Sequence, residues 1–208
     1  MGGLTLRQGA QQRGQEVLPC SLGQASRQRS DATPAMQPQA LEGRAQAVAA
    51  EAVLLDAAAF RRQKPAAVLS ALQTLEDFHK AQASVPDMLS RLTRSWRLVF
   101  SGPNKLAFLS YIPVDEDFVV KAEDGSLALE SDLGPIRAKF KGRFEWKADS
   151  NEMHFAFNQA QADLWGRQVW TKEVDFKPKT YSFFWASDAI ACARSSAGTL
   201  TLLKALQP

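Results

Sequence analysis

The run IRAKFKGRFEWK, from Ile136 to Lys147, has a charged residue at every second position and an apolar residue or glycine in between. A repeat of two residues is that of a β-strand, whose side chains point alternately to opposite faces of a sheet. The run therefore predicts a long antiparallel strand with a charged face in water and an aromatic face on a core. Its length exceeds the usual strand of roughly five to six residues, which suits a sheet that curls or closes into a barrel, with Gly142 allowing the bend.

Shorter strands are predicted on both sides of this run, each bounded by turn residues. They fall at 95–101, 118–122, 127–133, 153–157, 170–176, 181–186, 189–194 and 199–204. Nine or so short strands at close spacing are typical of an all-β sandwich or an up-and-down barrel. The sequence therefore predicts a mainly β domain over residues 93–208.

Two amphipathic helices are predicted before the strands. In 39–62, apolar residues recur at spacings of four and three, which places them on one helix face. These residues are Leu41, Ala45, Val48, Ala52, Leu55 and Ala59. The second helix, 66–82, has Val68, Leu72 and Leu75 on one face. We expect both helices to pack on the barrel or on each other, and the alternative for the first is a position on a membrane surface.

The first 35 residues differ in composition from the rest of the chain. They are rich in Gln, Arg, Ser and Gly and poor in acidic residues. This composition fits an organelle transit peptide, and the alternative is a disordered tail that carries no address. The whole chain of 208 residues has a net charge of only +3, which is too weak to indicate a nucleic-acid partner. No run of about 18 apolar residues indicates a transmembrane helix.

The sequence has few residues at the spacings that catalysis or metal binding requires. His79 and His154 stand alone, with no Cys or His at metal-ligand spacing. Cys192 lies in AIACAR, which predicts a small packing residue in a buried strand. We therefore predict no catalytic residues, no metal, no cofactor and no enzymatic activity. If the protein were an enzyme acting inside the barrel, Lys172 and Tyr181 would be its candidate catalytic residues.

Large apolar residues are frequent at the strand positions that are predicted to face inward. They are Trp96, Phe100, Phe140, Phe144, Trp146, Phe155, Phe157, Phe183 and Trp185. A small closed barrel either fills with side chains or holds one ligand. An ordinary packed core and a cavity for a lipophilic molecule are both compatible with this pattern.

Several segments resemble a known family when they are taken in order. They are Leu75-Glu76, the strand Ser95 to Ser101 within LTRSWRLVFSGPNKLAFLSYIPVDEDF, then SDLGPIRAKFKGRFEW and DAIACARSSAGTLTLLK. Over residues 60–204 the chain thereby resembles the plastid lipid-associated proteins, also called fibrillins or plastoglobulins. Two positions depart from the family pattern. Arg94 stands where the family has glycine before the tryptophan, and the closing turn 194–198 has only one glycine.

The resemblance implies a fold and a set of domains. The fold would be a lipocalin-like antiparallel β-barrel preceded by the two helices. The domains would be a chloroplast transit peptide at 1–35, a helical segment at 36–92 and the barrel at 93–208. In lipocalin-like folds an arginine near the end of the barrel often lies across the tryptophan of the first strand. Arg194 is therefore expected to contact Trp96 and joins the nine aromatic residues as a ligand-binding candidate.

The resemblance also implies a function. The protein would bind or carry a small hydrophobic molecule, such as a carotenoid, a quinone or a fatty acyl lipid. It would lie in the chloroplast, at thylakoids, at plastoglobules or in the stroma, and its partners would be that ligand and a membrane or plastoglobule surface. The first rival is a structural coat or protein-interaction module whose barrel is packed solid. The second rival is an enzyme that acts on a lipophilic substrate.

Overall fold

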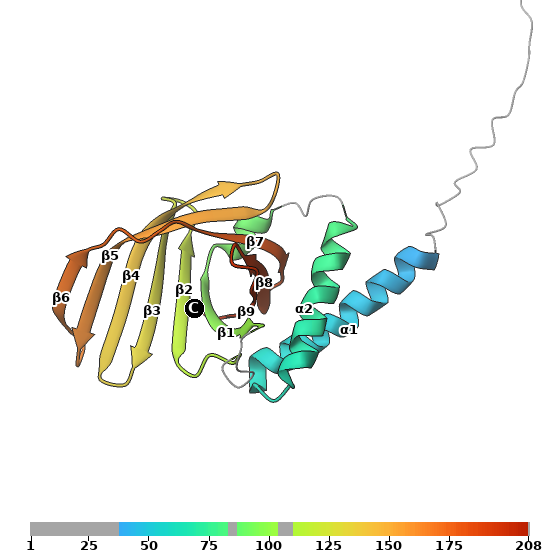
Figure 1. The fold of residues 1–208 in the computed structure, drawn as a ribbon, viewed down its shortest axis with the longest axis horizontal. Helices are drawn as coiled ribbons and strands as arrows, with labels where there is room; N and C mark the ends of the chain where they lie inside the picture. The colour runs from blue at the N-terminus through green and yellow to red at the C-terminus, as the bar shows by residue number, and fades with distance from the viewer. Residues whose placement is uncertain (1–37, 83–86, 104–109, 208) are drawn as a thin grey trace, which may run out of the picture. The chain divides into compact units, whose positions relative to one another are not determined.

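The computed structural model describes residues 38–82, 87–103 and 110–207 (Figure 1). The helices are α1 (Pro38–Phe60), α2 (Pro65–Lys80) and α3 (Met88–Leu92). The strands are β1 (Ser95–Gly102), β2 (Asp115–Lys121), β3 (Ser126–Leu133), β4 (Ile136–Lys147), β5 (Glu152–Leu164), β6 (Arg167–Glu173), β7 (Lys179–Ala186), β8 (Ile190–Ser195) and β9 (Leu200–Ala205). The predicted transit segment 1–35 lies outside the described residues.

The strands form one antiparallel sheet that closes on itself. Their order is β4-β3-β2-β1-β9-β8-β7-β5-β6, and a further pairing joins β4 to β5. Closure works because β5 is long enough for two partners on one edge. Its first part, Glu152 to Phe155, pairs with β7, and its last part, Gln159 to Leu164, pairs with β6. The predicted class, mainly β with a barrel-like antiparallel sheet after two helices, is confirmed.

The strand predicted from IRAKFKGRFEWK is present with the predicted bounds, and it closes the ring. Lys141 pairs with Gln159 but Gly142 pairs with Phe157, so one extra residue of β5 forms a bulge. A Cβ at Gly142 would overlap the carbonyl of Ala156 and lie 2.9 Å from the Cα of Phe157. The bend predicted at Gly142 is thus a bulge at which the two backbones approach too closely for any side chain.

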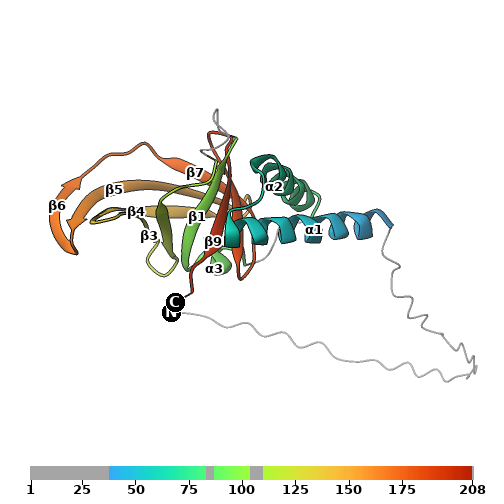
Figure 2. The same cartoon turned by 90° about the horizontal axis from the view of Figure 1, so that it is seen from below.

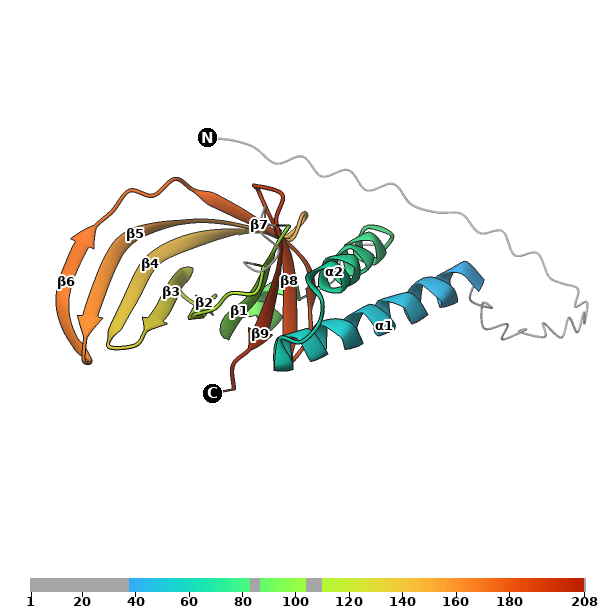
Figure 3. The ribbon, with the colours of Figure 1, turned by 60° about the horizontal axis from the view of Figure 1, so that its bottom comes forward.

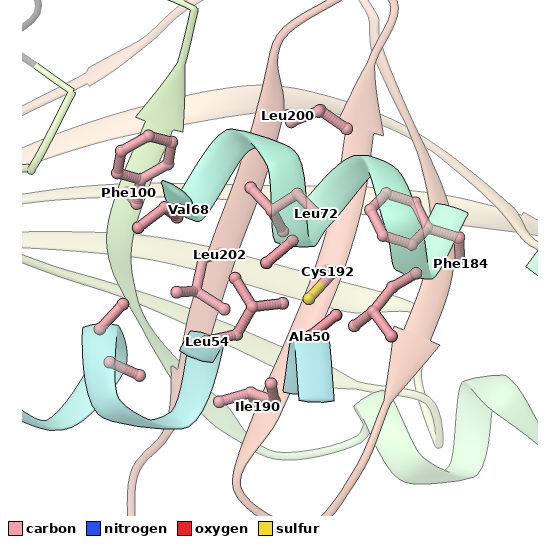
Figure 4. Close-up of a cluster of buried hydrophobic side chains, with 14 of the residues drawn as sticks. Ala50, Leu54, Val68, Leu72, Phe100, Phe184, Ile190, Cys192, Leu200 and Leu202 are labelled. Atoms are coloured by element: carbon pink, nitrogen blue, oxygen red, sulfur yellow. The ribbon is translucent and has the colours of Figure 1, made fainter. Parts of the chain in front are cut away.

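Each face of the closed sheet has its own buried cluster. The inner cluster draws residues from strands all around the ring, including Trp96, Phe118, Met153 and Phe183, and α3 adds Met88 and Leu92. The outer cluster lies between α1, α2 and the outer face of β1, β7, β8 and β9. It includes Leu54, Leu72, Phe100, Cys192 and Leu202 (Figure 4). Figure 2 shows α1 and α2 on the same side of the ring, where they cover the outer face of β1 and β7 to β9.

Helix α1 packs through a different face from the one that its larger apolar residues predict. The buried residues are Ala47, Ala50, Leu54, Ala57 and Ala58, whereas the predicted stripe from Leu41 to Ala59 is exposed. The face rich in alanine lets α1 approach α2 and the sheet closely. Because α1 carries apolar residues on both faces, their spacing alone could not identify the buried one. Helix α2 buries Val68, Leu72 and Leu75 as predicted.

Candidate ligand-binding site

Most of the aromatic residues predicted to face inward do so. Trp96, Phe155, Phe157 and Phe183 are buried in the inner cluster, and Phe140, Phe144 and Trp146 pack against it. The predicted β4–β5 hairpin brings these residues together, because Phe144 lies opposite Phe155 and Trp146 lies opposite Met153. Rings on neighbouring strands also lie close together. The Phe140 and Phe157 ring centroids are 5.9 Å apart, so the aromatic residues form a continuous wall.

Phe100 and Trp185 were predicted to face inward, and the structure places both on the opposite face. The pairing of β1 with β9 skips from Leu98 to Phe100, and that of β7 with β8 skips from Phe183 to Trp185. A one-residue bulge reverses the faces of all residues that follow it. Phe100 is therefore buried under the helices. Trp185 packs against the same outer cluster, where its Nε1 donates to Glu51 Oε1 at 3.1 Å.

The predicted contact between Arg194 and Trp96 is also wrong. Ala193 belongs to the inner cluster, so the next residue of the strand points outward, towards α2. There the Nε of Arg194 donates to Glu76 Oε1 at 2.7 Å, and its second amino group donates to Oε2 at 2.5 Å. The guanidinium over the Trp96 ring is that of Arg94, at 5.6 Å from the ring centroid. Arg94 is one of the two departures from the family pattern.

Two adjoining cavities open at the edge of the inner cluster, and both are partly open to solvent. The first, of about 140 Å³, is lined by Leu98, Glu116, Phe118, Leu129, Phe155, Phe157, Lys179, Tyr181 and Leu203. The second, of about 320 Å³, is lined by Leu129, Phe140, Phe157, Phe176, Lys177 and Lys179. Leu129, Phe157 and Lys179 line both, so the two cavities share a boundary. The aromatic wall therefore leaves part of the interior unfilled.

The polar groups of these cavities are few and of both signs. Burial raises the pKa of the Glu116 carboxyl, and the nearby Lys179 opposes this rise. Burial also raises the pKa of Tyr181, with a smaller contribution from the charge of Glu116. Lys177 and Lys179 are exposed, so they place positive charge where the cavities meet water. An apolar interior with cations at its edge suits an elongated apolar molecule that carries an anionic group.

The sequence pattern missed several residues of this site. Leu129 and Phe118 both lie in predicted strands, and the alternation of those strands is the signal that could have identified them. Phe176 was predicted to end a strand; it lies after β6, where its ring contacts Phe140 at 5.8 Å. Glu116, between two other acidic residues, was not predicted to line the site; it lies in β2 and is partly buried.

The remaining residues of chemical interest lie apart from one another. Lys172 is exposed on β6, opposite Ala160, while Tyr181 lines the first cavity. Cys192 is buried, and burial raises the pKa of its thiol well above the ordinary value. Within residues 38–82, 87–103 and 110–207, no group of three or more His, Cys, Asp or Glu side chains is arranged to hold a metal ion. None of the helices in these ranges is long and apolar enough to cross a bilayer.

Comparison with known proteins identifies no relative of this chain. Neither the family models nor the curated proteins nor the solved structures gave a match to this chain. The resemblance to plastid lipid-associated proteins therefore stays a prediction from the sequence.

Proposed function

We propose that this protein binds one small hydrophobic molecule inside its closed sheet and catalyses no reaction on it. The observation that carries this proposal is the pair of adjoining cavities, of about 140 and 320 Å³, behind the aromatic wall. Their lining supports an elongated apolar ligand, since Leu129, Phe140 and Phe157 offer no hydrogen bonds. Lys177 and Lys179 support a ligand with an anionic group, such as a fatty acid.

The location of the protein is proposed from the sequence, through the family resemblance and the composition of its first residues. We propose that it works in the chloroplast, at thylakoids or plastoglobules or in the stroma, and that residues 1–35 direct its import. The support is the composition of that segment, rich in Arg and Ser and poor in acidic residues. A fluorescent fusion of the full chain should enter plastids, and one that lacks residues 1–35 should stay in the cytosol. Plastid import of the shortened fusion would remove the transit function from this segment.

Uptake of a fluorescent fatty acid tests the ligand site. Leu129 lines both cavities, so Leu129→Trp would place a bulky indole ring at their common boundary. With cis-parinaric acid as the probe, we expect wild-type protein to bind and Leu129→Trp to bind at least about tenfold more weakly. A tenfold change corresponds to about 1.4 kcal/mol, which is less than the loss expected when a bulky side chain blocks a pocket.

The matched control makes the same kind of substitution away from the cavities. Val169 is on β6, is 61% exposed and lines neither cavity, so Val169→Trp should bind the probe as wild type does. Circular dichroism would establish that both variants fold. Equal binding by wild type and a folded Leu129→Trp variant would place the probe outside the cavities and would favour the structural rival.

A further inference from the structure

The apolar lining of the cavities continues along one face of β3, β4 and β5. Residues that pair across strands share a face, and every second residue along a strand returns to it. Leu129 pairs with Phe140, both at the second cavity. Two rows further along this face follow: Ser131, Ala138, Ala162 and Trp170, then Leu133, Ile136 and Leu164. Trp170, Leu133, Ile136 and Leu164 are all exposed. On β3, β4 and β5 these rows contain no charged residue; the last row ends on β6 at Arg167, which pairs with Leu164.

Two hairpin turns lie where these rows end. One joins β3 to β4 through Gly134 and Pro135, and the other joins β5 to β6 through Trp165 and Gly166. The backbone nitrogen of Trp165 donates to the carbonyl of Pro135 at 2.9 Å, which holds the turns side by side. In Figure 3 the strands β4, β5 and β6 curve away from the helices towards this end. The turns thus form a projecting edge that neither α1 nor α2 covers.

Trp165 is an unusual residue for its position. It is 78% exposed, and it shares a two-residue turn with Gly166 in which φ is 53° at Trp165 and 75° at Gly166. A turn with both central φ angles positive is of type I′ and favours Asn, Asp or Gly. A bulky residue in this region is a genuine outlier. Turn formation therefore gives no reason for a tryptophan here, and a role in binding does.

The charges around the two turns cancel. Arg137 and Asp132 form a two-pronged ion pair, with contacts of 2.6 and 3.1 Å, and Asp163 and Arg167 complete the set. An edge without net charge gives no electrostatic attraction to a charged partner. A protein partner would also need a groove shaped to receive two adjacent turns. A lipid surface needs no such groove, and tryptophan is enriched at membrane–water interfaces, where its ring is apolar and its N–H stays hydrated.

We propose that the two turns dock on an electrically neutral lipid surface, with Trp165 as the anchor. The apolar rows of β3, β4 and β5 then form a path by which a hydrophobic molecule passes between that surface and the cavities. The path rests on the proposed function, because it has a use only if the cavities take up such a molecule. Docking itself requires no molecule in the cavities and can be measured separately.

Flotation with phosphatidylcholine vesicles that contain no other lipid tests the docking. We expect full-length wild-type protein to float with the vesicles. Trp165→Asn should need at least about tenfold more lipid for half-maximal flotation. Asn-Gly is a favoured type I′ pair, so this variant should unfold at the same or a higher temperature than wild type. A loss of flotation can then not come from a loss of fold.

The control removes an exposed apolar side chain from α1, the helix for which a membrane surface was the alternative prediction. Val48 on α1 is 62% exposed, and Val48→Asn should float as wild type does. Three outcomes would overturn the proposal: no flotation of wild type, equal flotation of Trp165→Asn, or loss of flotation in Val48→Asn alone. A dimer that dissociates on Trp165→Asn, without flotation of wild type, would assign the edge to a second copy and would also overturn it.

The two proposals fail in different assays. Trp165→Asn should bind cis-parinaric acid from solution as wild type does, because Trp165 lines neither cavity. Leu129→Trp should still float with vesicles. If wild-type protein binds the probe but does not float, the docking surface is ruled out and the ligand site remains. If it floats but does not bind the probe, the ligand site is ruled out and the docking surface remains.

Discussion

Gly142→Ala is expected to lower the free energy of unfolding by about 3 kcal/mol or more. Overpacking in a well-packed core typically costs about 1–3 kcal/mol, and here the added methyl group meets backbone rather than a side chain that can move. It would overlap the carbonyl of Ala156 at the bulge where β4 and β5 close the ring. For a chain of this size the melting temperature should fall by roughly 6–12 °C, as measured by circular dichroism.

The control for this variant is the same substitution in a helix. A Cβ at Gly43 has Phe78 as its nearest neighbour, at 3.9 Å, and meets no backbone. Because alanine favours helix over glycine by about 0.5–1 kcal/mol, Gly43→Ala should be neutral or stabilising. A melting temperature for Gly142→Ala equal to that of wild type would contradict the close approach of β4 and β5, and with it the closure of the sheet.

Arg194→Met is expected to cost about 2–3 kcal/mol of stability. The side chain of Glu76 is only 7% exposed and would lose its two-pronged partner. Removing one member of a buried ion pair costs about 3–5 kcal/mol. The value here should be lower because Arg194 itself is 32% exposed and Lys80 stays 3.4 Å from Glu76. Urea unfolding at neutral pH measures this difference.

The matched control breaks an equivalent pair at the surface. Arg137 and Asp132 also form two hydrogen bonds, but their side chains are 53% and 45% exposed. Exposed ion pairs contribute about 1 kcal/mol or less, so Arg137→Met should change stability little. If Arg194→Met loses as little stability as Arg137→Met, then the burial of Glu76 does not make the ion pair between α2 and β8 stronger than an exposed pair.

The pH dependence of the same variant follows from the carboxyl group of Glu76. The hydrogen bond from Arg194 lowers the pKa of Glu76 in the folded state. The unfolded chain then binds the proton more readily, so this stabilisation is present above the ordinary carboxyl pKa of about 4.3. It is lost as the pH falls through the lowered folded pKa. The gap in stability between wild type and Arg194→Met should therefore narrow below about pH 4, and a constant gap from pH 7 to pH 3 would contradict this account.

The fold could be predicted from the sequence because a strand with one solvent-exposed face has a regular alternation of polar and apolar residues. The run from Ile136 to Lys147 gave the bounds of β4 without error, and its pairing with β5 followed from the short connection. The bulges in β1 and β7 are not marked by any pattern in the sequence, so Phe100 and Trp185 were predicted to lie on the wrong face. The buried face of α1 was predicted wrongly for another reason. Alanine packs closely against its neighbours, although it contributes little to an apolar stripe.

The candidate site could be predicted only in part. Alternation identified Phe140, Phe155 and Phe157 as inward residues, and all three belong to or pack against the inner cluster. Whether space remains between them depends on side-chain volumes around a closed ring, which no local pattern records. Trp165 could not be identified either, because its exposure depends on two turns that are about 30 residues apart and meet only when β4 pairs with β5.

An organic extract of the purified full-length protein tests the interior ligand site most directly. Mass spectrometry of the extract should search for pigments, quinones and fatty acids, with Leu129→Trp prepared in parallel. We expect close to one apolar molecule per wild-type chain and a much smaller amount from the variant. Extracts of both proteins that hold no apolar molecule, or the same amount of one, would contradict a ligand held in the cavities behind Phe140 and Phe157.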